Sequence, residues 1–427
     1  MIKHYFTILV SFFITHLYSQ STYIVNDLSD NPTIGSGFSG SLRYCINQTN
    51  ATLGLDTIKF SASINGNAVV VDSTLRVYDE IYVVGNGSAN SILRGSLLNT
   101  SGIIDLYNVT TGNYVLKNLK FESAVAQQST AFAQDAGTDF DTILIENCRF
   151  DSLDYAIFLD YSKNFVTIKN CEMNACKVGI AQQNMSKSMD IYNNSFNGNL
   201  WSAMYVQGLS FHVYNNLIIN TQVNIYAALY ISDPEFPGGS CIINNNTIVN
   251  NLQAGLKIDE HYGNASSIIV SNNIIYNNSP YDFTQALASG TVVTNCANTN
   301  NIVLNTDAAS TYTPTWYSNN NPLLDANYKP TNNSSIVINK SNPVTASLFD
   351  LENTAAIGIR EIGAYEYNGC GTTASITIGG VFTVCSGIAD TLDISASITN
   401  SIGVTYQWKE STGGVYNSIG SSTSTIV

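Results

Sequence analysis

The sequence predicts an all-β fold, a parallel β-helix solenoid, and two repeated patterns between residues 114 and 275 carry this prediction. The first pattern is an aliphatic residue, any residue, an Asn, two further residues and a large apolar residue. The Asn residues of successive repeats are 29, 23, 23, 22, 30 and 27 positions apart. A self-similar period of this length is typical of a solenoid, in which each repeat stacks on its neighbours to build one continuous core.

The Asn of the first pattern is expected at a sharp bend between two short strands, because Asn tolerates the left-handed backbone conformation better than most residues. Asn side chains at the same bend of consecutive coils can also form a hydrogen-bonded ladder, at the inter-strand spacing of about 4.8 Å. A helical solenoid is disfavoured, since the flanking runs alternate with period two. The predicted structural ladder consists of Asn118, Asn147, Asn170, Asn193, Asn215, Asn245 and Asn272.

The second pattern is a small residue followed by an apolar strand, about ten residues after each Asn. Side chains of a strand point alternately to its two faces, so two outward rows are expected on these strands. One row contains Phe158, Ala181, Tyr205, Tyr230 and Lys257. The next row contains Asp160, Gln183, Gln207, Ser232 and Asp259.

The first twenty residues predict an exported protein. Residues 1–20 are expected to be a secretory signal peptide, with Lys3 before a short apolar run and a plausible cleavage neighbourhood at Ser19 and Gln20. The apolar run is too short for a membrane span, and no longer one follows. We therefore expect a secreted or cell-surface protein without a membrane-spanning segment.

The remaining chain is predicted to contain an N-terminal cap with a short amphipathic helix, the β-helix, its C-terminal end and a partial immunoglobulin-like domain. These segments are residues 21–60, 61–305, 306–368 and 369–427, respectively. The last segment reads as alternating antiparallel strands with Cys385 ahead of Trp408, and it is shorter than the roughly 100 residues of a complete domain of this type.

Composition limits the possible partners. The formal net charge is −14, which argues against nucleic acids and anionic membranes, although it permits calcium binding. Eight Cys residues in an exported chain would suggest disulfides. Cys148 and Cys171, however, occupy the same slot of adjacent coils, where parallel side chains give poor disulfide geometry. Reduced, packed thiols are therefore the favoured interpretation, with a bridged pair as the alternative.

Two motifs at the ends of the repeats resemble those of a known family. Gly-Ser-Leu-Arg-Tyr-Cys-Ile at residues 40–46, followed by Gly-Leu-Asp-Thr-Ile-Lys-Phe at residues 54–60, resembles the cap of secreted right-handed parallel β-helix proteins with a pectin-lyase-like fold. Cys45 replaces the usual Ala of that cap. Glu-Ile-Gly-Ala-Tyr-Glu at residues 361–366 is similar to the signature of the choice-of-anchor Q domain.

This resemblance covers about residues 21–368 and implies a right-handed β-helix on the bacterial surface. Many such proteins carry immunoglobulin-like modules and a C-terminal sorting signal, often of the type IX kind, and no such signal is visible here. The resemblance implies adhesin-like roles. Its motifs assign no catalytic residues, and no signature of the enzyme families that share the fold is intact in this sequence.

The outward rows suggest a glycan-binding face. Aromatic side chains beside amides suit sugars, because the rings stack on apolar sugar faces while the amides bond to hydroxyl groups. The candidate glycan-binding residues are Phe158, Tyr205, Tyr230, Gln183 and Gln207. The alternative is that these side chains merely pack along the sheet, since single surface aromatics are common.

A catalytic site is the rival interpretation. Asp160 and Asp259 are four coils apart, or about 19 Å, too far for a hydrolase pair. Charged residues gather in only one stretch, where Asp233, Glu235, Asp259 and Glu260 could hold Ca²⁺ and where Lys257, Asp259 and His261 are the candidate catalytic residues. Solvated loop charges are the alternative explanation. His212 is expected simply to be exposed on a strand.

The sequence thus favours an adhesin-like, non-catalytic β-helix protein, expected to be a monomer, that binds an extracellular glycan or a host or cell-surface component. A polysaccharide lyase or glycoside hydrolase is the first alternative. A purely structural surface spacer is the second. No cofactor is required by any motif, with Ca²⁺ as an open possibility.

Overall fold

The structure is a computed structural model that describes residues 20–30, 33, 37–99, 101–107, 112–134, 142–160, 165–222, 226–232, 240–260, 267–287, 297–307, 318–356, 359–367, 394–395, 408–412, 415–419 and 425–426. The predicted signal peptide lies outside this part of the chain except for Gln20.

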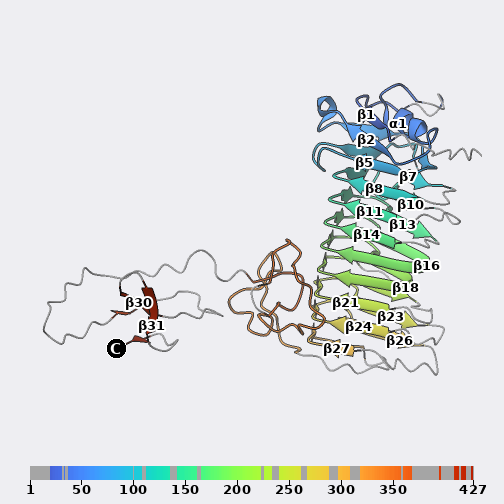
Figure 1. The fold of residues 1–427 in the computed structure, drawn as a ribbon. Coiled ribbons are helices and arrows are strands. Elements are labelled where there is room, and N and C mark those ends of the chain that lie inside the picture. Colours follow the sequence, from blue (N-terminus) through green and yellow to red (C-terminus); the bar gives the residue numbers. More distant parts are fainter. Residues whose placement is uncertain are drawn as a thin grey trace, which may run out of the picture.

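The described chain winds as a stack of coils, and a typical coil contributes one strand to each of three faces (Figure 1). The coil that starts at β11 (Thr142–Glu146) bends into β12 (Arg149–Asp151) and continues as β13 (Tyr155–Asp160). Each of these strands pairs in parallel with its equivalent in the next coil. The predicted parallel solenoid is confirmed.

The first face leads into the Asn bends. Its strands are β1 (Thr22–Val25), β2 (Asp56–Phe60), β5 (Ile81–Val84), β8 (Asn113–Lys117), β11, β14 (Phe165–Lys169), the second halves of β16 (Val178–Tyr192) and β18 (Ser202–Tyr214), β21 (Ser240–Asn244), β24 (Ser267–Ser271) and β27 (Ala297–Thr299). Strands β16 and β18 run without interruption from the third face onto the first.

The second face follows the bends and consists of short strands. They are β3 (Ala68–Val71), β6 (Ile92–Gly95), β9 (Lys120–Ser123), β12, β15 (Glu172–Asn174), β17 (Ser195–Asn197), β19 (Leu217–Ile219), β22 (Thr247–Val249), β25 (Ile274–Tyr276) and β28 (Ile302–Val303).

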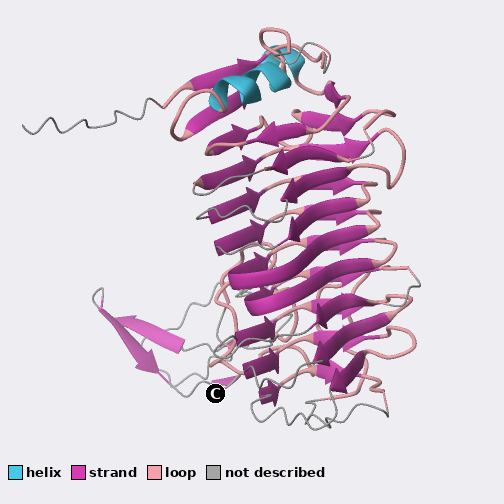
Figure 2. Ribbon diagram, turned by 90° about the vertical axis from the view of Figure 1, so that its right-hand side faces the viewer, coloured by secondary structure: helices cyan, strands magenta, loops and turns pink. Residues whose placement is uncertain are grey.

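The third face carries the second sequence pattern. Its strands are β4 (Leu75–Val77), β7 (Gly102–Leu106), β10 (Thr130–Gln134), β13, the first halves of β16 and β18, β20 (Ala227–Ser232), β23 (Ala254–Glu260) and β26 (Phe283–Leu287). Figure 2 shows the strands of the coils stacked one above another along the length of the solenoid.

The apolar positions of the first pattern form the core. The large apolar residue that follows each Asn is fully buried in every repeat, as are the aliphatic residues before it. Phe121 and Phe150 of adjacent coils stack with their ring centroids 5.2 Å apart. Burying a side chain of this size contributes about 1.5–3 kcal/mol, which explains why a repeat that cannot build a core alone is stable within the stack.

Helix α1 (Leu42–Thr49) lies at the N-terminal end of the stack (Figure 1). Its N-cap Ser41 accepts a hydrogen bond from the Tyr44 backbone N–H. Leu42, Cys45 and Ile46 are buried and belong to the main core. A short 3₁₀ helix, η1 (Ala62–Ile64), follows β2.

The seven predicted bend residues all adopt the left-handed conformation, with φ between 53° and 59°. Their side chains point away from the core, however, and form only scattered bonds with each other. Asn147 donates to Asn118 over 3.3 Å, and Asn215 donates to Asn193 over 3.2 Å. The seven predicted residues therefore form the bends, as expected, but their side chains do not form a continuous ladder.

The continuous ladder lies one residue later, inside the solenoid. Each buried amide donates to the next over 3.0 Å along Asn194, Asn216, Asn246, Asn273 and Asn301. Cys148 and Cys171 fill the same slot in the earlier coils, where each thiol lies against backbone carbonyl groups. The five Cys residues of the described chain are free, in agreement with the favoured interpretation of reduced thiols.

A second ladder occupies the opposite end of the short strands. The buried Asn251 donates to Asn278 over 2.7 Å, and Asn278 donates to Asp282 over 2.8 Å. The backbone N–H groups of Thr221 and Cys176 bond to Asn251 and Asn199 in the same way. Inward amides thus satisfy the backbone at both ends of each short strand.

The described residues between 318 and 367 pack along the flank of the later coils (Figure 1). Val337, Ile362 and Ala364 form an apolar cluster with side chains of the second face, including Ile219 and Ile274. We refer to residues 318–356 and 359–367 as the C-terminal segment. It lies beside the solenoid, whereas the sequence placed it at the end of the stack.

The later bend residues anchor this C-terminal segment. Asn245 donates to the Glu361 carbonyl and accepts from the Ser347 N–H, while Asn272 accepts from the Asn342 N–H over 2.7 Å. Asn245 and Asn272 are therefore fully buried, whereas Asn147 of the earlier coils is exposed. The outward amides serve as attachment points rather than as a ladder.

The docked segment contains a buried carboxyl group that should make its stability depend on pH. Burial, and then the neighbouring Glu366 carboxyl, raises the pKa of Glu361 from 4.5 to about 9. When the C-terminal segment is packed against the solenoid, Glu361 keeps a proton that it loses above about pH 4.5 once the segment is released. Packing of the segment should therefore weaken as the pH rises from about 4.5 to about 9. We expect Glu361→Gln to reduce this pH dependence, measured as the melting temperature at pH 5 and pH 9. Glu352→Gln, at an exposed position of the same segment, should retain it.

The end of the chain contributes two antiparallel strand pairs among the described residues. β29 (Ile394–Ser395) pairs with β32 (Thr425–Ile426), and β30 (Trp408–Thr412) pairs with β31 (Val415–Ile419). The rest of the predicted immunoglobulin-like domain lies outside the described residues.

Candidate functional site

The first outward row of the third face is present in the register expected from the sequence. Phe158 pairs with Ala181, Ala181 with Tyr205, Tyr205 with Tyr230, and Tyr230 with Lys257. Three aromatic side chains are thus aligned along the solenoid axis, with one small residue between the first and the second.

The second outward row is interrupted. Asp160 pairs with Gln183, and Gln207 pairs with Ser232, which pairs with Asp259. Between β16 and β18 the register shifts after Gln182, so the two candidate Gln residues belong to the two halves of a broken row. Sequence spacing cannot reveal such a bulge, because it depends on how two adjacent coils are connected.

The structure adds aromatic residues that the sequence analysis missed. Trp201 and Tyr226 lie two residues before the small residue of their repeats, at the entrance to the third-face strand. Tyr226 lies 5.9 Å from Tyr205, 5.8 Å from Tyr230 and 6.5 Å from Trp201, measured between ring centroids. The aromatic cluster consists of Tyr155, Phe158, Trp201, Tyr205, Tyr226 and Tyr230.

A hollow opens in this cluster where the row reaches Ala181. Its volume is about 100 Å³. The side chains that line it are Tyr155, Val178, Ala181, Gln183, Trp201, Ser202, Tyr205 and Tyr226. The Phe158 and Tyr205 positions are two coil spacings, or about 10 Å, apart. The hollow lies beside the small residue between them, and Tyr155, Trp201, Tyr205 and Tyr226 are its aromatic walls. A predicted glycan contact, Gln183, is thus beside the hollow.

Tyr230 is largely buried beneath the aromatic cluster and contributes little to its exposed surface. It is only 9% exposed, and it packs against Tyr205 with a centroid distance of 5.2 Å. Its hydroxyl group donates to the buried Asp259 carboxylate over 2.6 Å. Burial, and then this hydrogen bond, raises the pKa of Tyr230. The phenol therefore stays protonated and holds its ring in place.

The two lysines of the cluster are paired with carboxylates. Lys177 Nζ lies 2.9 Å from Asp154 and 3.8 Å from the centroid of the Trp201 ring. Lys257 Nζ lies 2.7 Å from Asp259 and 4.9 Å from the Tyr230 ring. Each of these two positive charges is compensated locally, so the described part of the cluster presents no uncompensated lysine to an acidic ligand.

The candidate catalytic and calcium residues are only partly described. Lys257 and Asp259 are brought together, but as an ion pair supported by Tyr230. Asp233, Glu235 and His261 lie outside the described residues, as does the side chain of Glu260. In the described part of the chain, no three His, Cys, Asp or Glu side chains gather in a way that could hold a metal ion.

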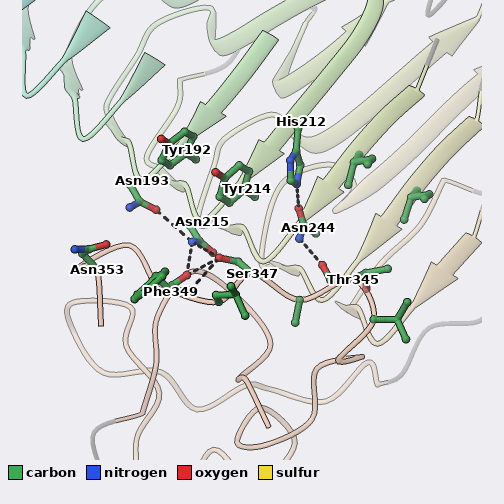
Figure 3. Close-up of a pocket in the computed structure, with 15 residues that line it drawn as sticks. Tyr192, Asn193, His212, Tyr214, Asn215, Asn244, Thr345, Ser347, Phe349 and Asn353 are labelled. Atoms are coloured by element: carbon green, nitrogen blue, oxygen red, sulfur yellow. Dashed lines mark hydrogen bonds between the residues drawn. The ribbon is translucent and has the colours of Figure 1, made fainter. Parts of the chain in front are cut away.

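A groove of about 660 Å³ lies on the first face, between its outward side chains and the C-terminal segment (Figure 3). His212 lines this groove together with Tyr192 and Tyr214. The expectation that His212 is simply exposed was wrong, because a segment more than a hundred residues later in the chain covers its surroundings.

Comparison with known proteins bears on this fold. Residues 101–264 match the family model described as "Right handed beta helix region". The chain contains a right-handed β-helix. The matched region of this β-helix includes the whole aromatic cluster.

Among solved structures, this chain is similar to the crystal structure of the tailspike protein of the Acinetobacter phage vB_ApiP_P1. Sequence identity is 12%, the TM-score is 0.35, and the match covers 72% of this chain and 61% of the tailspike chain. The chain thus spans less than two thirds of that tailspike chain. Among curated proteins, none matches this sequence. No helix of the described residues has both the length and the apolar character needed to cross a membrane.

Proposed function

We propose that this β-helix protein is an exported, surface-displayed, non-catalytic glycan-binding protein that works in an adhesin-like manner through its aromatic cluster. The observation that carries the proposal is the hollow of about 100 Å³ beside Ala181, with Tyr155, Trp201, Tyr205 and Tyr226 around it. Aromatic walls can stack on the apolar faces of a sugar, and the Gln183 amide can bond to its hydroxyl groups.

The electrostatics of the cluster favour a neutral sugar over an acidic one. Lys177 and Lys257 are each compensated by a nearby carboxylate, and the whole chain carries a formal net charge of −14. An acidic polysaccharide would be repelled at long range and would find no uncompensated lysine at the cluster. The ligand class we propose is therefore a neutral hexose-containing glycan, bound one ring at a time in the hollow.

The rival enzyme hypothesis would use Lys257 as the proton acceptor of a lyase. Lys257 Nζ contacts the buried Asp259 carboxylate over 2.7 Å, so this ion pair would have to break before the amine could act as a base. The spacer hypothesis predicts neither binding nor turnover, and one set of measurements separates the three.

The test uses the full chain on an array of neutral and acidic glycans, followed by calorimetric titration of the strongest ligand. We expect binding to neutral glycans, and a loss of at least about fivefold in affinity for Trp201→Ala and for Tyr226→Ala, since stacked rings contribute on the order of 1 kcal/mol each. Tyr78→Ala is the matched control, because Tyr78 is an exposed tyrosine, paired with Tyr107, in an earlier coil.

An assay for unsaturated uronate products, with added Ca²⁺, runs in parallel. Turnover that disappears in Lys257→Ala would overturn the proposal in favour of a lyase. The absence of both binding and turnover would leave a structural spacer. Equal losses in Tyr78→Ala and Tyr226→Ala would show that any bound glycan does not use the cluster.

A further inference from the structure

The groove on the first face has the size and lining of a small-molecule site. Its volume of about 660 Å³ falls within the range of roughly 300–1,000 Å³ that is common for such sites. Ile242 and Ile269 form an apolar part of its floor, and Val344 and Leu348 of the C-terminal segment line its other side. The segment is held in place by the bend amides, since Asn215 donates to Ser347 over 2.8 Å.

The two tyrosine rings of the groove offer little free surface for stacking, which leaves Phe349 as its exposed aromatic side chain. The rings of Tyr192 and Tyr214 are stacked on each other, with centroids 4.6 Å apart, and His212 covers the other side of Tyr214 at 4.2 Å. Lys169 lies over the Tyr192 ring at 6.0 Å. The two tyrosine rings are thus covered by their neighbours, which distinguishes this groove from the aromatic cluster, where several rings surround one hollow.

The hydrogen bonds around His212 fix its tautomer. Asn244 donates its amide N–H to the Thr345 carbonyl over 2.5 Å, so its oxygen is the atom that lies 2.7 Å from His212 Nε2 (Figure 3). An amide oxygen only accepts, so Nε2 must carry the proton. The neutral imidazole then keeps its lone pair on Nδ1, for which the described residues offer no hydrogen-bond donor.

His212 is neutral at ordinary pH. Burial lowers its pKa, and the bond to Asn244 and the charge of Asp190 oppose this only in part. Asp190 precedes His212 by one coil in the same row, and Ile242 follows it, so Asp190 is the charged group that faces the ring along this row. The groove therefore combines apolar walls with one oriented proton acceptor.

We infer that this groove binds a neutral, mainly apolar molecule that carries a hydroxyl donor, such as a phenol or an aryl alcohol, with the hydroxyl group bonded to His212 Nδ1. This site is separate from the aromatic cluster, because it lies on another face and depends on the C-terminal segment. Its occupancy would not require the proposed glycan-binding function.

The test compares two probes with the same apolar body, 2-naphthol and 2-methoxynaphthalene, titrated into the full chain at pH 7.5. Only 2-naphthol can donate to Nδ1, so we expect it to bind at least about fivefold more tightly, the effect of one hydrogen bond. In His212→Phe the two probes should bind equally. Ile242→Trp, which fills the groove from a half-buried outward position, should weaken both probes together.

Acidification provides a readout that needs no variant. When the pH falls through the lowered pKa of His212, protonation removes the acceptor, so the preference for 2-naphthol should disappear while 2-methoxynaphthalene is little affected. Equal affinities of the two probes at pH 7.5, a preference that persists in folded His212→Phe, or no binding of either probe would overturn the inference. Circular dichroism melts establish that each variant is folded.

Discussion

Replacing Ala181 by Phe is expected to abolish glycan binding and, because Ala181 is buried, to lower the stability of the solenoid by about 1–3 kcal/mol without unfolding it. Ala181 is the only small member of the row between Phe158 and Tyr230, and the hollow of about 100 Å³ exists because its side chain is a single methyl group. A benzyl group at this position would occupy the space in which we propose that a sugar ring binds. It would also extend an outward aromatic row that the fold already accommodates at Phe158 and Tyr205.

The measurement is calorimetric titration with the glycan selected on the array. The affinity is expected to fall about a hundredfold or more, because the Phe side chain would exclude the sugar from the hollow. Ala133→Phe is the matched control. Ala133 precedes Phe158 in the same row, two coils before Ala181, so the same substitution there should leave affinity unchanged. Unaltered binding by folded Ala181→Phe would exclude the hollow as the binding site.

Replacing Asn246 by Ala is expected to give a large loss of stability. The Asn246 oxygen accepts from both the backbone N–H and the side-chain amide of Asn216, and its own amide donates to the Val213 carbonyl over 2.8 Å. All of these groups are buried, and water cannot replace the lost partner without entering the core. Each buried group left unsatisfied costs about 1–3 kcal/mol, so we expect a loss of about 3–4 kcal/mol in total.

Urea denaturation followed by circular dichroism measures this loss as a shift of the unfolding midpoint. Asn197→Ala is the control, because Asn197 is exposed and its side-chain oxygen accepts a hydrogen bond from the exposed Asn220 side chain. Its effect should stay within about 0.5 kcal/mol. Similar effects of the two substitutions would mean that the inner amides do not form a cooperative ladder.

Much of the fold could be predicted because it is repeated. The aliphatic residue, the Asn and the large apolar residue recur in seven coils between residues 114 and 275. Each of these coils is stabilised by stacking on its neighbours. The left-handed bends at Asn118 and its equivalents follow from the backbone preference of Asn alone. The outward row from Phe158 to Lys257 follows from strand alternation.

The position of the ladder could not be predicted with the same certainty. Asn193 and Asn194 are adjacent, and the sequence does not show which of the two side chains turns inward once the first adopts a positive φ. The structure shows that the bend residue faces outward and that its successor points into the core. In the earlier coils the inward position is occupied by Cys148 and Cys171, whose thiols are buried. Apolar thiols suit this inward position but would gain nothing at the outward bend.

The sequence by itself determined that the chain is a β-solenoid, where its bends lie and which side chains align along the third face, because these properties depend on local conformation and on a period that each repeat restates. Only the tertiary structure decided where function could reside. The hollow at Ala181 needs residues from four coils, and the groove at His212 needs the C-terminal segment folded against the later bends. Both are concave surfaces between parts of the chain that are distant in sequence, and no single repeat encodes the space between them.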